Sequence, residues 1–421
     1  MSLQGKKLLI MGDNPESAPL VQTANEMGVY TIVVGVNKDT VTKQIASKQY
    51  DVDALNVAKL VDIVNRERID GIMVGVADIL VRSYCKVCEQ VGLPCYANET
   101  AVKYLSDKQT FKEQLKKVDL PVIPEYQHSN AYISGNFERI PLPVVVKPVD
   151  NGGGTGISIV KTLSELQEGV NKAIANSKSG RIQIEKYMQG DIIACYYTIM
   201  DGHVYISSVE DNLFTHRQGN LCPITTGHIY VSKYIDSYME KAHDKICALL
   251  KDIEVKNGVL QINAFVENGE FFFYDPGYRL QGEAQHHILN AVNGFDHKKM
   301  LVEFALTGSM SNNNFQELND PYLRGKKAVS MWVLLKKGTI GKIKGLEILN
   351  KDSNIVYIGQ RFDEGDIVSE NMLGTEKQVF ARIYIVSDTK IALYNSVKNI
   401  RENLVILDTE GNDMILDALS I

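Results

Sequence analysis

The segment around Lys147 combines a cation with an unusual density of glycine. Lys147 ends an apolar run, and a second β-type run follows four closely spaced glycines, Gly152, Gly153, Gly154 and Gly156. Ordering a glycine costs about 0.5–1 kcal/mol more than ordering an alanine, so this density indicates a close approach to the backbone. A glycine loop can donate its N–H groups to a polyphosphate that the lysine also reaches. The alternative is a strand-end lysine before an ordinary hairpin. A Walker P-loop is excluded because its lysine follows the glycines.

The segment IQIEKYMQGD has the pattern of a strand edge that meets a nucleotide base. Glu185 ends an apolar run, and a turn at Gly190-Asp191 follows it. Such an edge can offer backbone groups to an adenine and a carboxylate to a ribose. We therefore expect nucleotide contacts in this segment.

Oxygen donors and an arginine lie on the two arms of a predicted hairpin. Asn263 precedes the Asn268-Gly269 turn, and Asp275 and Arg279 follow it. Hard oxygen ligands beside a guanidinium suit Mg²⁺-bound phosphate during transfer. A strict two-residue turn would leave Asn263 and Asp275 one position out of register. We therefore expect a three-residue turn or a bulge, which places them opposite each other.

Candidate substrate-binding residues lie between these motifs. Arg217 and His228 fall in the segment 210–228, which has no apolar periodicity and is predicted to be a loop bordering the acceptor site. A guanidinium there could hold a carboxylate through two hydrogen bonds. A simple solvated loop is the alternative. Tyr278 flanks Arg279 and is a candidate for the wall of the same pocket.

The composition is that of an ordinary globular protein. The chain has 421 residues, a net charge of −6 and 44% hydrophobic residues. We expect no nucleic-acid partner, because no basic run is present, and no membrane span, because no apolar stretch is long enough. The first residues lead directly into a strand and show no signal-peptide pattern. Six scattered cysteines favour a cytoplasmic location.

Alternating apolar runs and helical patterns predict an α/β protein with four parts. The first residues read as β-α-β-α with a single glycine in their first turn, which indicates a Rossmann-like unit without the dinucleotide fingerprint. After the polar stretch at 311–314, short strands predominate. The Rossmann-like unit is expected at residues 1–98 and the β-rich C-terminal domain at 316–421. Between them, residues 99–188 carry the glycine loop and residues 189–315 carry the hairpin.

These motifs, in this order, resemble the ATP-grasp superfamily over the whole chain. The resemblance is strongest to stand-alone ligases such as L-amino-acid ligases and to phosphoribosylglycinamide-synthetase-like or carbamoyl-phosphate-synthase-like proteins. It implies a two-lobed grasp with ATP and Mg²⁺ (or Mn²⁺) as cofactors. Carbamoyl-phosphate synthase has two tandem grasp modules, and this chain has one.

The resemblance also implies roles for individual residues. Lys108 and Lys147 would contact phosphate, the four glycines would close over it, and Asp191 would take ribose hydroxyls. Glu185, Tyr187 and Met188 would meet the adenine through main-chain groups and packing. The implied ATP-binding set is Lys108, Lys147, Gly152, Gly153, Gly154, Gly156, Glu185, Tyr187, Met188 and Asp191.

The metal and catalytic positions depart from the usual pattern of the superfamily. Asn263 and Asp275 match the two metal ligands, and Arg279 matches the arginine that stabilises the transferred phosphoryl group. The superfamily usually has Glu-x-Asn-x-Arg on the second strand, where this chain has Asp275 and, at the Asn position, Gly277. The metal site of this chain therefore has less negative charge, and one side-chain ligand fewer, than is usual in the superfamily.

The resemblance implies an ATP-dependent carboxylate–amine ligase that forms a C–N bond through an acyl phosphate, releasing ADP and phosphate. Its partners would be small carboxylates and amines, which the sequence does not specify, and a homodimer is the default expectation. A catalytically weak or inactive ATP-binding module is the second hypothesis, motivated by the thinned metal site. A dehydrogenase is the third, and the missing glycines of the first turn argue against it.

Overall fold

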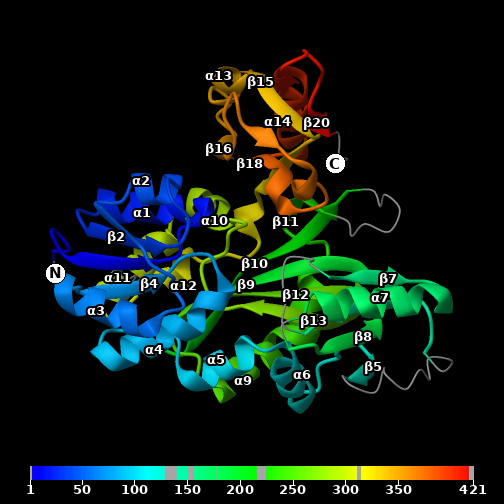
Figure 1. The fold of residues 1–421 in the computed structure, drawn as a ribbon, viewed down its shortest axis with the longest axis horizontal. Coiled ribbons are helices and arrows are strands. Elements are labelled where there is room, and N and C mark those ends of the chain that lie inside the picture. Colours follow the sequence, from blue (N-terminus) through cyan, green and yellow to red (C-terminus); the bar gives the residue numbers. More distant parts are fainter. Residues whose placement is uncertain are drawn as a thin grey trace.

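The computed structural model describes residues 2–128, 140–149, 156–177, 179–215, 224–310 and 314–416. The predictions for Gly152, Gly153, Gly154 and Arg217 lie outside the described residues. In Figure 1 the N-terminal unit lies on the left, the small lobe on the right and the C-terminal region at the top, around a central sheet. Within the described residues, no helix combines the length and the apolar character needed to cross a bilayer.

The N-terminal unit is an open parallel sheet, as predicted. Its four strands lie in the order β3-β2-β1-β4 and are all parallel. The strands are β1 (Lys7–Met11), β2 (Tyr30–Gly35), β3 (Lys48–Asp51) and β4 (Gly71–Val74). The helices are α1 (Ala18–Glu26), α2 (Val41–Gln44), α3 (Val57–Glu67) and α4 (Val81–Val91). Strand β1 is buried between its neighbours and is apolar at nearly every position, as parallel central strands are.

The small lobe is a four-stranded antiparallel sheet in the order β5-β8-β6-β7. Its elements are β5 (Glu125–His128), β6 (Val144–Pro148), β7 (Ser158–Val160), α7 (Leu163–Ala175) and β8 (Ile182–Lys186). Helices α5 (Glu99–Leu105) and α6 (Lys108–Lys117) precede it. Asp107 caps α6, because its carboxylate accepts from the backbone N–H groups of Gln109 and Thr110 at 2.9 and 3.0 Å. This cap places Lys108 on the first turn of the helix.

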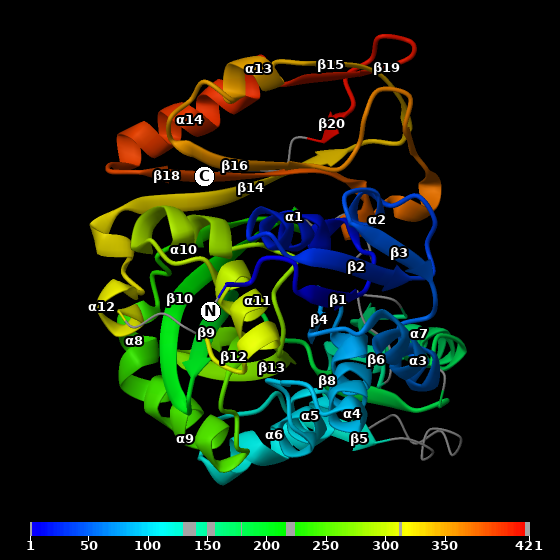
Figure 2. The same ribbon diagram turned by 90° about the vertical axis from the view of Figure 1, so that its left-hand side faces the viewer.

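A nine-stranded sheet runs through the large lobe and into the C-terminal region (Figure 2). Its main path is β13-β12-β9-β10-β11-β14-β18-β16, and β20 pairs with β14. The strands are β9 (Asp191–Met200), β10 (His203–Phe214), β11 (Thr225–Tyr230), β12 (Gly258–Glu267), β13 (Glu270–Gly277), β14 (Lys327–Leu335), β16 (Ile355–Gln360), β18 (Val379–Ser387) and β20 (Ile415–Leu416). This single sheet therefore connects the predicted metal hairpin with the C-terminal region.

The prediction of a loop over 210–228 is wrong at both ends of that segment. Strand β10 continues to Phe214, and β11 begins at Thr225. Glu210 and His228 are fully buried on these strands. Because polar side chains occupy a buried sheet face here, the alternation of apolar and polar residues that identifies a strand is missing.

Helices complete the large lobe and the C-terminal region. The large lobe contains α8 (Ile235–Tyr238), a π-helical turn (Met239–His243), α9 (Asp244–Asp252), α10 (His286–Asn293), α11 (His297–Thr307) and α12 (Phe315–Leu318). The C-terminal region adds a small sheet of β15 (Gly338–Lys344), β17 (Ile367–Val368) and β19 (Val405–Asp408), with α13 (Leu346–Leu349) and α14 (Lys390–Asn403). The expected β-rich character is confirmed, although the sequence reasoning did not anticipate α14.

Candidate active site

A cavity of about 510 Å³ lies between the small lobe and the large-lobe sheet. Five residues predicted to bind ATP line it, namely Lys147, Glu185, Tyr187, Met188 and Asp191. Apolar residues from both lobes, including Ile159, Phe265 and Tyr274, form the remaining walls. An apolar slot with a few polar groups at its edge suits a planar base with a charged tail.

Glu185 holds two lysines at the inner end of this cavity. Its carboxylate is buried and accepts from Lys112 on one oxygen and from Lys147 on the other. Burial alone would raise the pKa of Glu185, but the charges of Lys147 and Lys112 hold it below its ordinary value. The carboxylate therefore stays ionised and positions the two cations.

Asp191 lies at the outer end of the cavity, where it is engaged by two neighbours. It accepts from the Tyr234 hydroxyl at 2.5 Å, and its other partner is the Lys233 ammonium at 2.6 Å. The preceding glycine, Gly190, is required by a close approach, because a Cβ there would lie 1.9 Å from the carbonyl oxygen of Val266. This contact fixes the turn that brings Asp191 to the cavity.

The metal hairpin has the register that the sequence predicted. Strands β12 and β13 are joined by Asn268 and Gly269, which both have positive φ, as a two-residue type I′ turn requires. A bulge beside Asn263 shifts the register by one residue, so Asn263 pairs with Asp275. The expected bulge is confirmed. Lys108 reaches across from α6 and lies 3.3 Å from an oxygen of Asp275.

The two oxygen donors fit a magnesium ion that is only partly coordinated by protein. Asn263 and Asp275 lie directly opposite each other in the antiparallel pair. Among the described residues, no group of three or more His, Cys, Asp and Glu side chains could hold a metal ion. Mg²⁺ commonly takes one or two protein oxygens and completes its shell with nucleotide phosphates and water, so the pair is sufficient.

Arg279 is fixed by contacts outside the hairpin. One guanidinium nitrogen donates to Asp78 of the N-terminal unit, and another donates to Gln281 at 2.5 Å. Its Nε atom is buried without a hydrogen-bond partner among the described residues. The arginine is therefore held in place by two of its nitrogens and keeps one donor for a ligand.

One glycine at the site is required by its surroundings, and a second has a close neighbour that can move. Gly156 has a φ of +80°, and a Cβ there would lie 2.7 Å from Asn176 and 2.8 Å from Pro148. At Gly277 a Cβ would lie 2.8 Å from the amide nitrogen of Gln281. Because this nitrogen is the end of a flexible side chain, it could move aside for a larger residue at 277.

Tyr278 does not line a substrate pocket, contrary to the sequence-based expectation. It is 3% exposed, and its hydroxyl donates to the carbonyl oxygens of Tyr96, at 2.8 Å, and Asn257. These contacts join the N-terminal unit to the large lobe behind Arg279. Tyr278 therefore has a structural position, because its polar group is already used by the backbone.

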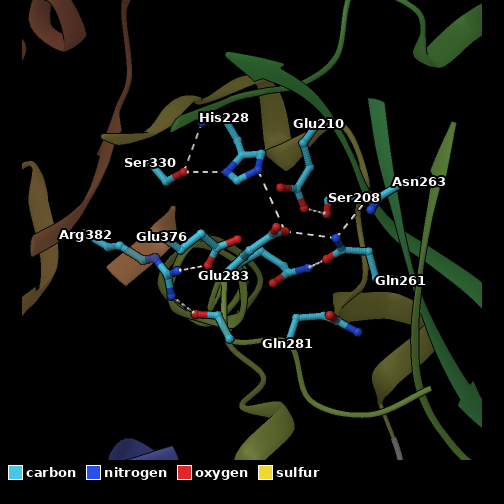
Figure 3. A network of polar contacts seen from close by, with 12 residues as sticks. Ser208, Glu210, His228, Gln261, Asn263, Gln281, Glu283, Ser330, Glu376 and Arg382 are labelled. Atoms are coloured by element: carbon cyan, nitrogen blue, oxygen red, sulfur yellow. Dashed lines mark hydrogen bonds and ion pairs between the residues drawn. The ribbon is translucent and has the colours of Figure 1, made fainter. Parts of the chain in front are cut away.

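A cluster of polar residues continues from the metal hairpin along the same sheet face (Figure 3). Gln261 donates to Asn263 at 3.2 Å and to Glu283 at 2.9 Å, and Glu283 lies 3.8 Å from the Nε2 atom of His228. His228 in turn lies 2.9 Å from the hydroxyl of Ser330 on β14. The predicted residue His228 is thus near the site, but in a buried strand instead of a loop.

Arg382 of β18 borders this cluster from the C-terminal region. Its guanidinium pairs with Glu376 at 2.8 Å, donates to the carbonyl oxygen of Gly282, and lies 4.1 Å from the ring of Trp332. The C-terminal region therefore supplies a cation next to Glu283 (Figure 3).

Sequence reasoning missed several of these residues, and their signals differ. Lys112 follows Lys108 by one helical turn, so the shared helix face was a usable signal. Glu283 follows Arg279 by four residues in a polar stretch and could also have been noted. Asp78 and Arg382 have no local signal, because each comes from a distant segment.

Residues 107–312 match a family model described as "Carbamoyl-phosphate synthase L chain, ATP binding domain". The expected resemblance to ATP-grasp proteins is therefore confirmed for this part of the chain. Among curated proteins, the chain is 27% identical over 190 residues to the formate-dependent phosphoribosylglycinamide formyltransferase of Bacillus velezensis, covering 44% of this chain and 49% of that protein. It is 27% identical over 206 residues to the carbamoyl phosphate synthase large chain of Clostridium acetobutylicum, covering 44% and 19%. The chain thus spans less than half the length of each of these relatives.

Solved structures of ATP-grasp proteins share the fold over nearly the whole chain. Phosphoribosylglycinamide synthetase from Anaerococcus prevotii superposes with a TM-score of 0.76 and 19% identity, covering 96% of this chain and 100% of that one. L-amino acid ligase from Bacillus licheniformis gives a TM-score of 0.78 and 16% identity, covering 96% and 99%. The predicted fold class is confirmed by these structures.

Proposed function

Because residues 107–312 match the ATP-grasp domain of carbamoyl-phosphate synthases, we propose that the chain is an ATP-dependent carboxylate–amine ligase. The observation that carries this proposal is the placement of Lys147, Glu185 and Asp191 around one interlobe cavity that adjoins the Asn263–Asp275 pair. Phosphoryl transfer depends mainly on positioning and on neutralising charge, and the site offers both.

Three cations would bind the triphosphate. Lys147 and Lys112 share Glu185, and Lys108 lies beside Asp275, so the phosphates would lie between the cavity and the metal hairpin. Asn263 and Asp275 would hold Mg²⁺, or Mn²⁺, which when bound neutralises phosphate charge. By the resemblance, Gly152, Gly153 and Gly154, which lie outside the described residues, would also contact phosphate.

The reaction would proceed in two displacements. A carboxylate oxygen of the first substrate attacks the γ-phosphorus of ATP, the bond from that phosphorus to the β–γ bridging oxygen breaks, and ADP leaves. Arg279 would stabilise the negative charge on the transferred phosphoryl group. An amine then attacks the acyl carbon, the bond from that carbon to the phosphate oxygen breaks, and phosphate leaves as the C–N bond forms and the amine loses a proton.

The test is ADP release at saturating Mg-ATP with pools of small carboxylates and amines, comparing the wild type with Arg279→Ala. A ligase releases ADP only with certain pools, and the variant loses that release. Dividing the active pool then identifies the substrates. Absence of pool-dependent release with any pool, while ATP still raises the melting temperature, would replace this proposal with a non-catalytic ATP-binding module. The missing side-chain ligand at Gly277 is the observation that favours that second candidate.

We also propose that the protein is cytoplasmic and forms a homodimer. The described cysteines Cys85, Cys88, Cys95, Cys195 and Cys247 are free thiols, which supports a cytoplasmic location. Small carboxylates and amines are the proposed substrates, and a homodimer is the proposed assembly.

A further inference from the structure

Three side chains face one another on the buried face of the central sheet, next to the metal hairpin (Figure 3). Glu210 comes from β10, His228 from β11, and Glu283 from the connection between β13 and α10. The Nε2 atom of His228 lies 3.8 Å from the carboxylate of Glu283. Glu210 faces the same centre and is held on one oxygen by the Ser208 hydroxyl at 3.0 Å.

The cluster contains a buried polar atom that has no partner. Glu210 and His228 are both 0% exposed. Glu210 has the buried hydroxyl of Tyr230 as a neighbour besides Ser208, but among the described residues nothing forms a hydrogen bond with Nε2 of His228. Buried polar atoms are almost always hydrogen-bonded, so this nitrogen calls for a further molecule or group.

The charges around the cluster favour a cationic occupant. Burial, reinforced by the charge of Glu283, raises the pKa of Glu210 to about 8. Burial, reinforced by Arg382, lowers the pKa of His228 to about 3, so its ring is neutral. The cation of Arg382 is matched by Glu376 at 2.8 Å. A bound cation would be stabilised by Glu283 and would allow Glu210 to ionise.

The cluster adjoins both the reacting centre and a second cavity. Gln261 donates to Glu283 and to the predicted metal ligand Asn263, so one side chain separates the two sites. The residue before Glu283, Gly282, lines a cavity of about 560 Å³ between the N-terminal unit and the C-terminal region. Apolar side chains, including those of Ile45 and Phe362, form part of its wall.

We propose that Glu210, His228 and Glu283 form the subsite for the ammonium group of a primary amine whose apolar body occupies the second cavity. This inference rests on the proposed ligase function, because the amine would be its nucleophile. Carboxyl oxygens with a neutral imidazole suit N–H donors. A phosphate or carboxylate would face two glutamates and is disfavoured.

The test measures binding of n-butylammonium chloride by isothermal titration at constant ionic strength, with tetramethylammonium chloride as a cation that lacks N–H donors. The variant is Glu210→Gln, which is close in shape to the protonated acid and removes only the ability to ionise. The matched control is Glu402→Gln, because Glu402 is 60% exposed on α14. Glu283→Gln gives a second test at a partly exposed position, should Glu210→Gln fail to fold.

We expect saturable binding of butylammonium to the wild type and to Glu402→Gln, none of tetramethylammonium, and binding to Glu210→Gln weakened by about tenfold or more, as for loss of a charged hydrogen bond. Equal binding to the wild type, Glu210→Gln and Glu283→Gln, or no saturable binding, would overturn the subsite and leave ordered water as the occupant. ATP binding and pool-dependent ADP release are measured on the same samples. If the wild type showed neither ATP binding nor pool-dependent ADP release, the proposed ligase function would be refuted. If it showed both but did not bind the amine, only the subsite would be refuted.

Discussion

Asp78 of the N-terminal unit forms an ion pair with Arg279, which follows it by 201 residues and ends the metal hairpin. The arginine proposed to act on the phosphoryl group is thus positioned by a residue of the N-terminal unit. Tyr278 reinforces the same junction through the backbone of Tyr96. The N-terminal unit therefore has a role in the arrangement of the catalytic centre.

Asp78→Asn should lower kcat by roughly tenfold or more and change the KM for ATP little. The amide keeps the shape but removes the charge that orients Arg279, and a charged hydrogen bond is worth about 1.5–3 kcal/mol. Steady-state ADP release with the active substrate pool measures both constants. A variant with normal kcat would show that Gln281 alone positions the arginine.

Lys147→Ala and Arg279→Ala should affect different constants. Lys147 lies in the nucleotide cavity, so its loss should mainly weaken ATP binding. Arg279 lies outside that cavity beside the hairpin, so its loss should mainly lower kcat, by about 10²–10³-fold as for other groups that stabilise developing charge. ATP affinity by titration and kcat by ADP release separate the two effects. The same loss of kcat at unchanged KM in both variants would contradict this division of roles.

Glu185→Gln should destabilise the protein by about 3–5 kcal/mol, because it removes the counter-charge of the buried Lys147 and leaves Lys112 with Glu125 alone, at 3.4 Å. Chemical denaturation at pH 7 measures the free energy of unfolding. Glu402→Gln is the matched control, since its exposed pair with Lys398 should contribute about 0.3–0.5 kcal/mol. A change as small as that of the control would mean that the two lysines find other partners.

The sequence contained enough information for the hairpin but not for the surroundings of its residues. With a two-residue Asn-Gly turn, positions 263 and 275 are one residue out of register, so a bulge was needed to pair them. The bulge is present. Periodicity failed at Glu210 and His228 because polar groups are buried there. The contact of Asp78 with Arg279 left no pattern, because contacts between distant segments depend on tertiary packing.

Buried histidines should make the protein sensitive to mild acid. Burial lowers the pKa of His228, His287 and His297 to about 3, and that of His286 well below its ordinary value. The unfolded imidazoles take up protons as the pH falls through about 6.5 and the folded ones do not, so the contribution of the histidines to stability falls as the pH decreases towards 3. Glu210, with its pKa raised to about 8, holds a proton in the folded state that the unfolded chain lacks, so its contribution increases as the pH falls and opposes that of the histidines. Between pH 6.5 and 5.5 each of the four histidines should cost ~1 kcal/mol and Glu210 should return ~1.4 kcal/mol, which gives a net loss of ~3 kcal/mol.

His297→Gln should reduce this acid sensitivity by about one histidine, or ~1 kcal/mol between pH 6.5 and 5.5. Its ring is fully buried against the rings of Tyr196 and Phe295. Its Nε2 atom lies 2.6 Å from the hydroxyl of Thr198, and Nδ1 has no hydrogen-bond partner among the described residues. Urea denaturation at pH 7.5, 6.5 and 5.5 gives the slope for the wild type and the variant. The exposed His203, replaced by Gln, should leave the slope unchanged. If the variant at position 297 kept the wild-type slope, the buried imidazole of His297 would have to bind a proton as readily as the unfolded chain does, and the prediction would be wrong.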